Sequence, residues 1–274
     1  MKLTTIQTKL KEFQNYRKKN ILITDVDEIF MNEFIDYYKL NNYAHNTTQR
    51  EFSFIKTVCK KAKFLGMQVS HQLEGLNIKP KKVDSIYLTP EELELIENTN
   101  FEDELLNNVK DWLIISVNCG QRVSDFMRFS TDMIRDEGEN KFIEFTQQKT
   151  GKLMTVPLHR KILNILNQRN FQFPDKIGHQ EYNQLLKKVC EIAGLTYETY
   201  GGKQIGHRKV YGEYKKFELV SSHIGRRSFA TNNYGQIPTS YLIYITGHKT
   251  EDMFLNYIGK SNKDIAVEIA KYFK

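Results

Sequence analysis

A tyrosine nine residues after a histidine, together with polar residues far upstream, constrains the folding of this chain most strongly. The two residues are His248 and Tyr257, in the segment Gly-His-Lys-Thr-Glu-Asp-Met-Phe-Leu-Asn-Tyr. Upstream, His223 and Arg226 lie in Ser-His-Ile-Gly-Arg-Arg-Ser-Phe-Ala-Thr, and Arg122 lies in Cys-Gly-Gln-Arg-Val-Ser-Asp. If these residues act together, the fold must bring three distant segments to one place.

The residue types suit the attack of a hydroxyl group on a phosphodiester. Negative charge spreads over the non-bridging oxygens during such an attack, and the planar guanidinium of arginine meets those oxygens in bidentate geometry. A tyrosine hydroxyl is a poor nucleophile until its proton is accepted, so nearby imidazoles and guanidiniums are expected. The product would be a covalent phosphotyrosine, which conserves the energy of the broken bond.

The length allows two domains, and the charge falls into three blocks. The chain has 274 residues, 40% of them apolar, and a net charge of +7. Residues 1–84 hold 15 Lys and Arg against 9 Asp and Glu, residues 85–139 hold 4 against 13, and residues 140–274 hold 21 against 11. Two basic blocks around an acidic one fit two DNA-facing surfaces, although ordinary solvated helix faces explain the charge equally well.

Composition argues against several other classes. The cysteines are three, widely spaced and in apolar contexts, which indicates core residues of a reducing compartment and not disulfides or a zinc site. No apolar run approaches the ~20 residues of a membrane span, and no signal-peptide pattern is present, so a cytoplasmic, nucleoid-associated protein is expected. Asp, Glu and His show no metal-ligand spacing, which makes a metal-dependent nuclease the least favoured reading.

The first part of the chain reads as helices followed by a linker. Residues 29–40 and 47–64 carry apolar residues at three-to-four spacing, and Asn46 or Thr47 is expected to cap the second helix. A basic, proline-containing linker at residues 77–88 then separates two patterned regions.

The boundary between these regions is placed near residue 84, which gives domains at residues 1–84 and 85–274. Thr89-Pro90-Glu91-Glu92 has the pattern of a capping box that starts a new helix. An apolar helix at 109–118 is expected to end at Cys119-Gly120, with Arg122 opening the next helix.

Two alternating segments, 141–147 and 153–158, predict a hairpin with Lys149 at its tip. A helix is expected around 182–192, and residues 197–218 read as an irregular or β-ribbon excursion. Helices should return from Ser222, with interruptions near Pro238 and Gly247. The expected fold is mainly α with a small β-sheet or hairpin, an α+β chain.

Six residues together resemble the catalytic set of the tyrosine recombinases, also called phage integrases, in order, spacing and local context: Arg122, Lys149, His223, Arg226, His248 and Tyr257. The resemblance covers most of the chain. It implies a helical, SAM-like core-binding domain at residues 1–84 and an integrase catalytic domain in the remainder. The implied activity is that of a mobile-element integrase, which cuts DNA through a 3′-phosphotyrosyl bond without a metal or nucleotide cofactor.

The resemblance also implies a role for each residue. Arg122 and Arg226 would clamp the scissile phosphate, and His223 would accept or shuttle the proton of the tyrosine. His248 would hydrogen-bond the phosphate. Lys149 would be the general acid that protonates the departing 5′ oxygen, with Lys152 as the fallback candidate.

Taken one at a time, the same residues have simpler explanations. Arg122 could pair with Asp125 on a helix surface, and Lys149 could be an ordinary solvated lysine. His223 could be a satisfied, half-buried histidine, and His248 could brace a helix start. The combination favours the recombinase.

Partners follow from the same resemblance. Double-stranded recombination sites are the expected substrate, bound by a clamp of two domains, with no role for a membrane. A homotetramer on paired sites is expected to form by exchange of a C-terminal helix with apolar residues at Ile265, Ile269 and Phe273, assisted by accessory DNA-bending proteins. Residues expected to contact the DNA backbone are Lys56, Lys60, Lys63, Lys79, Lys81, Lys82 and Arg227. Arg227 points about 100° away from Arg226 on a helix, so a purely structural role is the alternative for it.

Two alternative functions stay open, and the sequence differs in one respect from the pattern of the family. A type IB topoisomerase uses nearly the same chemistry, and a catalytically inert relative could serve as a DNA-binding regulator. Integrases with arm sites carry a further small N-terminal DNA-binding domain, whereas this sequence starts with the helix that leads into the core-binding region. A shortened chain and a simple integrase without arm sites are both compatible with that start.

Overall fold

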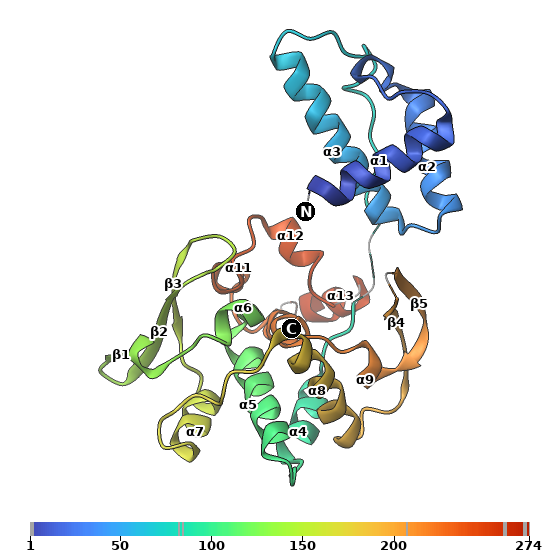
Figure 1. Ribbon diagram of the computed structural model, residues 1–274. Helices are drawn as coiled ribbons and strands as arrows, with labels where there is room; N and C mark the ends of the chain where they lie inside the picture. The colour runs from blue at the N-terminus through green and yellow to red at the C-terminus, as the bar shows by residue number, and fades with distance from the viewer. Residues whose placement is uncertain are drawn as a thin grey trace. The chain divides into compact units, whose positions relative to one another are not determined.

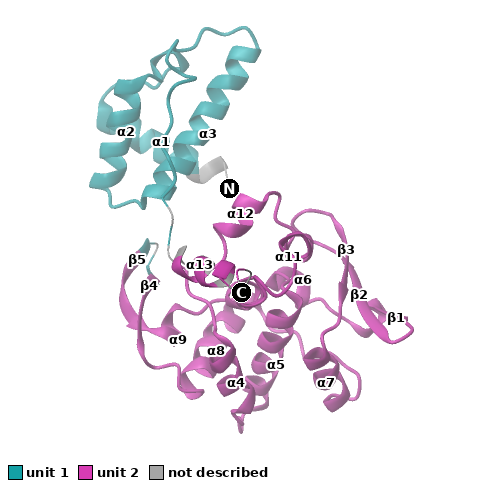
Figure 2. Ribbon diagram, turned by 180° about the vertical axis from the view of Figure 1, so that it is seen from behind, with its two compact units in different colours: residues 1–83, 204–209 teal, residues 84–203, 210–274 magenta. Residues whose placement is uncertain are grey.

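The computed structural model describes residues 3–81, 83, 85–206, 208–259, 262–270 and 273. It divides into two compact units (Figures 1 and 2). Unit 1 comprises residues 1–83 and 204–209, and unit 2 comprises residues 84–203 and 210–274. None of the helices formed by the described residues combines the length and apolar character of a membrane span.

Unit 1 is built from three helices around an aromatic core. They are α1 (Leu3–Arg17), α2 (Glu28–Leu40) and α3 (His45–Phe64), with a 3-10 turn η1 (Ile23–Asp25) between the first two. The ring of Phe13 lies edge-on to Phe30 and Phe34, with centroids 5.6 and 5.3 Å apart. Edge-to-face pairs of this kind add stability beyond the area they bury. The two helices predicted from apolar spacing in this region are confirmed.

The start of α3 differs from the expectation, because neither Asn46 nor Thr47 is its N-cap. Ala44 occupies that position and supplies no side-chain hydrogen bond. The amide of Asn46 instead bonds the backbone of Lys81 twice, donating through Nδ2 to the carbonyl and accepting the N–H at Oδ1, both at 2.8 Å. Asn46 therefore ties the chain that leads out of unit 1 to the start of α3.

Unit 2 contains a three-stranded antiparallel sheet, most of a two-stranded ribbon and further helices; the ribbon residues between 204 and 209 are assigned to unit 1. The sheet has the order β1 (Ile134–Glu137), β2 (Asn140–Thr146) and β3 (Leu153–Pro157), and the ribbon consists of β4 (Glu198–Ile205) and β5 (Arg208–Lys215). The helices are α4 (Pro90–Asn98), α5 (Glu104–Cys119), α6 (Val123–Phe126), α7 (Arg160–Gln168), α8 (His179–Ile192), α9 (Lys216–Leu219), α10 (Ile224–Asn232), α11 (Thr239–Thr246), α12 (Glu251–Leu255) and α13 (Asn262–Ala270), with a 3-10 turn η2 (Thr131–Met133) before β1.

This arrangement confirms the predicted α+β class, the β2–β3 hairpin and the ribbon. Strand β1 and helix α7 were not predicted. The capping box at the start of α4 is present, since the side chain of Thr89 accepts from the N–H of Glu92 and the Glu92 carboxylate accepts from the N–H of Thr89. That carboxylate also pairs with Lys216 in α9 and so joins α4 to the end of the ribbon.

Helix α5 forms the centre of unit 2 and packs against α4, α7, α8 and α10 (Figure 1). Its Trp112 is fully buried and donates through Nε1 to the carbonyl of Asp175 at 2.8 Å. The helix ends at Gly120, whose positive φ of 66° forms a left-handed C-cap. Because α5 is fixed on several sides, the residues that follow its end are held in a defined place.

The contact between α5 and α10 depends on Gly225. A Cβ atom at this position would lie 1.8 Å from Oγ of Ser116, too close for any side chain. The backbones of the two helices can approach closely only because residue 225 has no side chain. This approach sets the position of α10, which carries two of the candidate residues.

We expect Gly225→Ala to lower the free energy of unfolding by about 1–3 kcal/mol, because the added methyl group must push α10 away from α5. Gly178→Ala is the matched control, since its Cβ would meet only the Glu181 carboxylate, at 3.9 Å, and its φ is −60°. Urea unfolding measures both variants. Equal stability of the two would show that the close approach is not required.

Candidate active site

Arg122 is placed by the turn that ends α5. It is the N-cap residue of α6, with an extended backbone at φ −78° and ψ 153°. A side chain at Gly120 would meet the Phe229 ring at 2.5 Å, so the turn needs glycine for space as well as for its φ. The guanidinium of Arg122 is half-buried, and its Nη1 is fully shielded from solvent.

Arg226 comes from α10 and reaches the same turn. Its side chain is 2% exposed, and Nη1 donates to the carbonyl of Gly120 at 3.0 Å. This hydrogen bond spans more than a hundred residues of sequence and connects the two arginine segments directly. Burial and the neighbouring Arg122 lower the pKa of Arg226 to about 10, so it stays charged at neutral pH.

His223 is the N-cap residue of α10, and its side chain is accessible at the surface. Desolvation within the cluster, followed by the charges of Arg227, Arg226 and Arg122 and by His179, lowers its pKa below the usual value. A histidine with a lowered pKa is neutral at pH 7 and can accept a proton.

His248 follows α11, which ends at Gly247 with φ 61°. The hydroxyl of Thr246 donates to the carbonyl of Leu242 at 2.5 Å and lies 2.8 Å from Nδ1 of His248. Because a hydroxyl group has a single proton, Nδ1 of His248 carries the proton in this arrangement. Nε2 is then the free ring nitrogen, and it becomes a donor to an anion when the ring is protonated.

Burial, with the charges of Arg226 and Arg122, lowers the pKa of His248 to about 4. An unfolded chain would protonate this histidine near pH 6.5 while the folded one keeps it neutral, so its contribution to stability is present above pH 6.5 and is lost as the pH falls towards 4. We expect the unfolding free energy of the unsubstituted protein to drop by about 1–2 kcal/mol more than that of His248→Gln between pH 7 and pH 5. Urea titrations at the two pH values test this, and parallel losses in both proteins would contradict it.

Tyr257 lies after α12, beside His248. The two rings have centroids 4.8 Å apart and an interplanar angle of 49°. The guanidinium carbon of Arg227 lies 5.1 Å from the centre of the Tyr257 ring. The Tyr257 phenol also acts electrostatically on Arg226, whose pKa it raises.

The structure thus brings together Arg122, His223, Arg226, His248 and Tyr257. Within the described part of the chain, three buried polar atoms of this cluster have no hydrogen-bond partner: Nη1 of Arg122, Nη2 of Arg226 and the hydroxyl of Tyr257. Buried polar groups in folded proteins are normally paired, and the two unpaired N–H groups here are cationic. Such a cluster is prepared for an anion with several oxygen acceptors.

Lys149 is not part of this cluster. It lies on the exposed turn between β2 and β3. The fallback candidate, Lys152, lies with Nζ 4.5 Å from the centre of the Tyr244 ring on α11.

A network of amides, which the sequence did not reveal, links this turn to the cluster. Nε2 of Gln147 donates to Gln121 at 3.3 Å, and Oε1 of Gln147 accepts from the hydroxyl of Thr150 at 2.7 Å. Gln121 in turn donates to the carbonyl of Ile245 at 2.8 Å. The side chains next to Arg122 and to the Lys149 turn therefore bond each other and the helix that precedes His248. Apart from their positions next to Arg122 and near Lys149, nothing in the sequence identifies Gln121 and Gln147 as part of the site.

The lysines expected to contact DNA have mixed surroundings. Lys56 donates to the carbonyls of Glu74 and Leu76, and Glu74 also pairs with Lys60 at 2.9 Å and with Lys63 at 3.7 Å. The side chains of Lys79 and Lys81 are exposed, and Lys82 lies outside the described residues. Arg227, placed with these residues from the sequence, contacts Tyr257.

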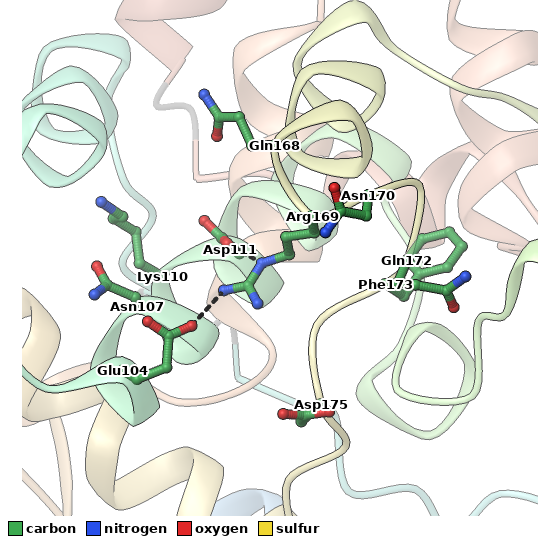
Figure 3. Close-up of a pocket in the computed structure, with 10 residues that line it drawn as sticks. All are labelled: Glu104, Asn107, Lys110, Asp111, Gln168, Arg169, Asn170, Gln172, Phe173 and Asp175. Carbon is green, nitrogen blue, oxygen red and sulfur yellow. Dashed lines mark hydrogen bonds and ion pairs between the residues drawn. The ribbon is translucent and has the colours of Figure 1, made fainter.

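A separate hollow of about 500 Å³ lies among residues of α5, the end of α7 and the segment after it (Figure 3). Its central charge is Arg169, whose Nε bonds Asp111 at 2.6 Å and whose Nη2 lies 3.5 Å from Glu104. The cation of this hollow is therefore already paired, whereas Nη1 of Arg122 and Nη2 of Arg226 have no partner among the described residues. None of the candidate residues lines it.

Comparisons with known proteins agree with this arrangement. Residues 2–78 match the family described as the phage integrase SAM-like domain. A search of curated proteins found no match.

Solved structures resemble the chain over nearly its whole length. A lambda integrase dimer bound to a COC′ core site has a TM-score of 0.61 and 16% identity, covering 96% of this chain and 91% of that one. The Tn1549 transposon integrase in complex with circular intermediate DNA gives 0.62 and 15%, covering 98% and 94%. XerH recombinase bound to a palindromic difH substrate gives 0.65 and 14%, covering 96% and 76%. The chain therefore has the fold of these integrases and of this site-specific recombinase, and its residues 2–78 match a phage integrase SAM-like domain.

Proposed function

We propose that this protein is a site-specific DNA recombinase of the integrase type, which cleaves and rejoins DNA through a 3′-phosphotyrosyl bond at Tyr257. The observation that carries the proposal is the set of buried, unpaired donors around that tyrosine: Nη1 of Arg122, Nη2 of Arg226 and the phenolic hydroxyl. A DNA phosphate has non-bridging oxygens for both guanidiniums and a phosphorus atom for attack by the hydroxyl.

In the proposed reaction, the Tyr257 oxygen forms a bond to phosphorus, and the bond from phosphorus to the 5′ oxygen breaks. The tyrosine proton passes to His223, which its lowered pKa keeps neutral at pH 7. Arg122 and Arg226 hold the phosphate oxygens, and His248, protonated once the anion is bound, donates from Nε2. Lys149 supplies the proton for the departing 5′ hydroxyl. Attack by the 5′ hydroxyl of a partner strand reverses these steps and completes the exchange.

In the proposed function both parts of the chain bind DNA. Residues 1–84 form the core-binding domain, and residues 85–274 form the catalytic domain. The exposed Lys79 and Lys81 are the best placed of the proposed contacts. Lys60 and Lys63 would have to leave Glu74 to reach a phosphate, which costs little because exposed ion pairs are weak.

Assembly is proposed to use the C-terminal helix. The side chains of Ile269 and Phe273 are exposed, by 48% and 84%, while the side chain of Ile265 lies outside what the structure describes. These two residues do not cover their own domain, in line with docking on a second protomer. A lambda integrase tetramer bound to a Holliday junction is among the similar structures, with 16% identity and a TM-score of 0.60. We further propose that the protein forms a homotetramer on paired sites. Accessory DNA-bending proteins are proposed to assist it, and the proposed location is the cytoplasm.

Covalent capture on DNA tests this function. The full chain is incubated in EDTA with nicked duplexes from the DNA that flanks its native gene, and SDS-resistant adducts are mapped by peptide analysis. A phosphotyrosine at residue 257 supports the proposal. Binding without any adduct would favour an inert DNA-binding relative, and relaxation of a supercoiled plasmid that lacks a recombination site would favour a topoisomerase.

A further inference from the structure

Arg227 lies against the nucleophile and not on an open face of α10. Its guanidinium carbon is 5.1 Å from the centre of the Tyr257 ring, within the range of a cation–π contact. Nη1 donates to the carbonyl of Ile86 at 3.3 Å, and Nε is buried without a partner among the described residues. The side chain is thus held between an aromatic ring and a backbone carbonyl, with its charge directed at the ring.

A second residue on the same face of α10 holds the same segment. Thr231 is four residues after Arg227 and therefore lies above it on the helix. Its fully buried Oγ1 accepts the N–H of Gly259 at 3.0 Å, two residues beyond Tyr257. A Cβ at Gly259 would lie 2.5 Å from the ring of Tyr87, so the segment after the tyrosine is closely confined.

Two different faces of helix α10 consequently contribute residues to the candidate site. His223 and Arg226, three residues apart, belong to the cluster with the unpaired donors. Arg227 and Thr231 contact the tyrosine and the residues after it. The same rigid element can therefore set the distance between the phosphate clamp and the attacking oxygen.

Resting on the proposed function, we infer that Arg227 is a positioning residue, which orients the Tyr257 ring for attack. Burial lowers the pKa of Arg227 and attraction to Tyr257 raises it, so the two side chains interact electrostatically as well as by contact. Orientation matters, because a displacement of about 1 Å at a reacting atom can cost about a hundredfold in rate.

The test is single-turnover cleavage of the nicked duplex by the full chain at pH 7 and saturating DNA. Arg227→Met removes the charge and keeps the length of the side chain, whereas Arg227→Lys keeps the charge and loses the planar fork. Thr231→Val removes only the hydrogen bond to Gly259. DNA affinity is measured for each variant at several salt concentrations, and folding is checked by thermal unfolding.

We expect Arg227→Met to cleave about 10- to 100-fold more slowly at saturating DNA, because the tyrosine ring loses the cation that holds it. Arg227→Lys, which keeps a cation beside the ring, should recover part of that rate. Thr231→Val should also slow cleavage at saturating DNA. DNA affinity and its salt dependence should be unchanged in all three.

Three results would overturn the inference. An unchanged rate at saturating DNA, with a salt dependence reduced by about one phosphate contact, would make Arg227 a DNA-binding residue. Failure of both Arg227 variants to fold, or cleavage by Arg227→Lys as slow as that by Arg227→Met, would make it a structural brace. Failure of the unsubstituted protein to form an adduct would instead remove the proposed function.

Discussion

Tyr257→Phe is expected to abolish covalent capture of DNA while DNA binding is retained. The substitution removes one oxygen atom and keeps the ring, so the contacts with His248 and with the Arg227 guanidinium can persist. Without that oxygen no phosphotyrosyl bond can form, and the rate falls below detection. Because the hydroxyl is buried without a partner in the described structure, its loss should not destabilise the fold.

The measurement is SDS-resistant adduct on a nicked duplex, with binding followed in parallel by a gel-shift assay. Tyr244→Phe and Tyr241→Phe are matched controls, since both rings are on α11 and exposed by 45% and 63%. Each control should form adduct at the unsubstituted rate. Persistent adduct in Tyr257→Phe, mapped to another residue, would exclude Tyr257 as the nucleophile.

Much of the fold could be predicted because its signals are local. The start of α4 depends on a box within four residues, and the end of α5 depends on a single glycine with positive φ. Strand β1 was missed because its residues, apart from a half-buried Ile134, are polar and exposed, so no apolar alternation marks it. Neither candidate N-cap of α3 could be excluded from sequence, because Asn46 is engaged by Lys81, 35 residues away.

The candidate site likewise has parts that local sequence signals predict and parts that depend on contacts between distant residues. The residues around Tyr257 could be chosen from two short runs and one arginine. The glutamines that support them could not, because Gln147 acts through a tertiary hydrogen bond to Gln121 that no spacing encodes. Arg227 is the clearest case. The helical angle correctly separated it from Arg226, but what lies on that side of α10 is a tyrosine thirty residues further along the chain.

Removal of either phosphate-clamping arginine is the second large expected effect. Arg122→Ala and Arg226→Ala should each slow single-turnover cleavage by about 10²- to 10³-fold, because each deletes a preorganised charge where negative charge develops. Arg122→Ala is the cleaner variant. Arg226 also donates to the carbonyl of Gly120, so its removal disturbs the turn that ends α5 as well as the clamp.

Lysine substitutions separate charge from geometry in this pair. Arg122→Lys keeps the positive charge but loses the planar fork, so its rate should fall between those of the unsubstituted protein and Arg122→Ala. Arg160→Ala, at the exposed first residue of α7, is the control for general loss of positive charge and should cleave normally. If Arg122→Ala cleaved as fast as Arg160→Ala at saturating DNA, the unpaired guanidinium beside Tyr257 would have no part in the chemical step, and the proposed anion site would have to be reassigned.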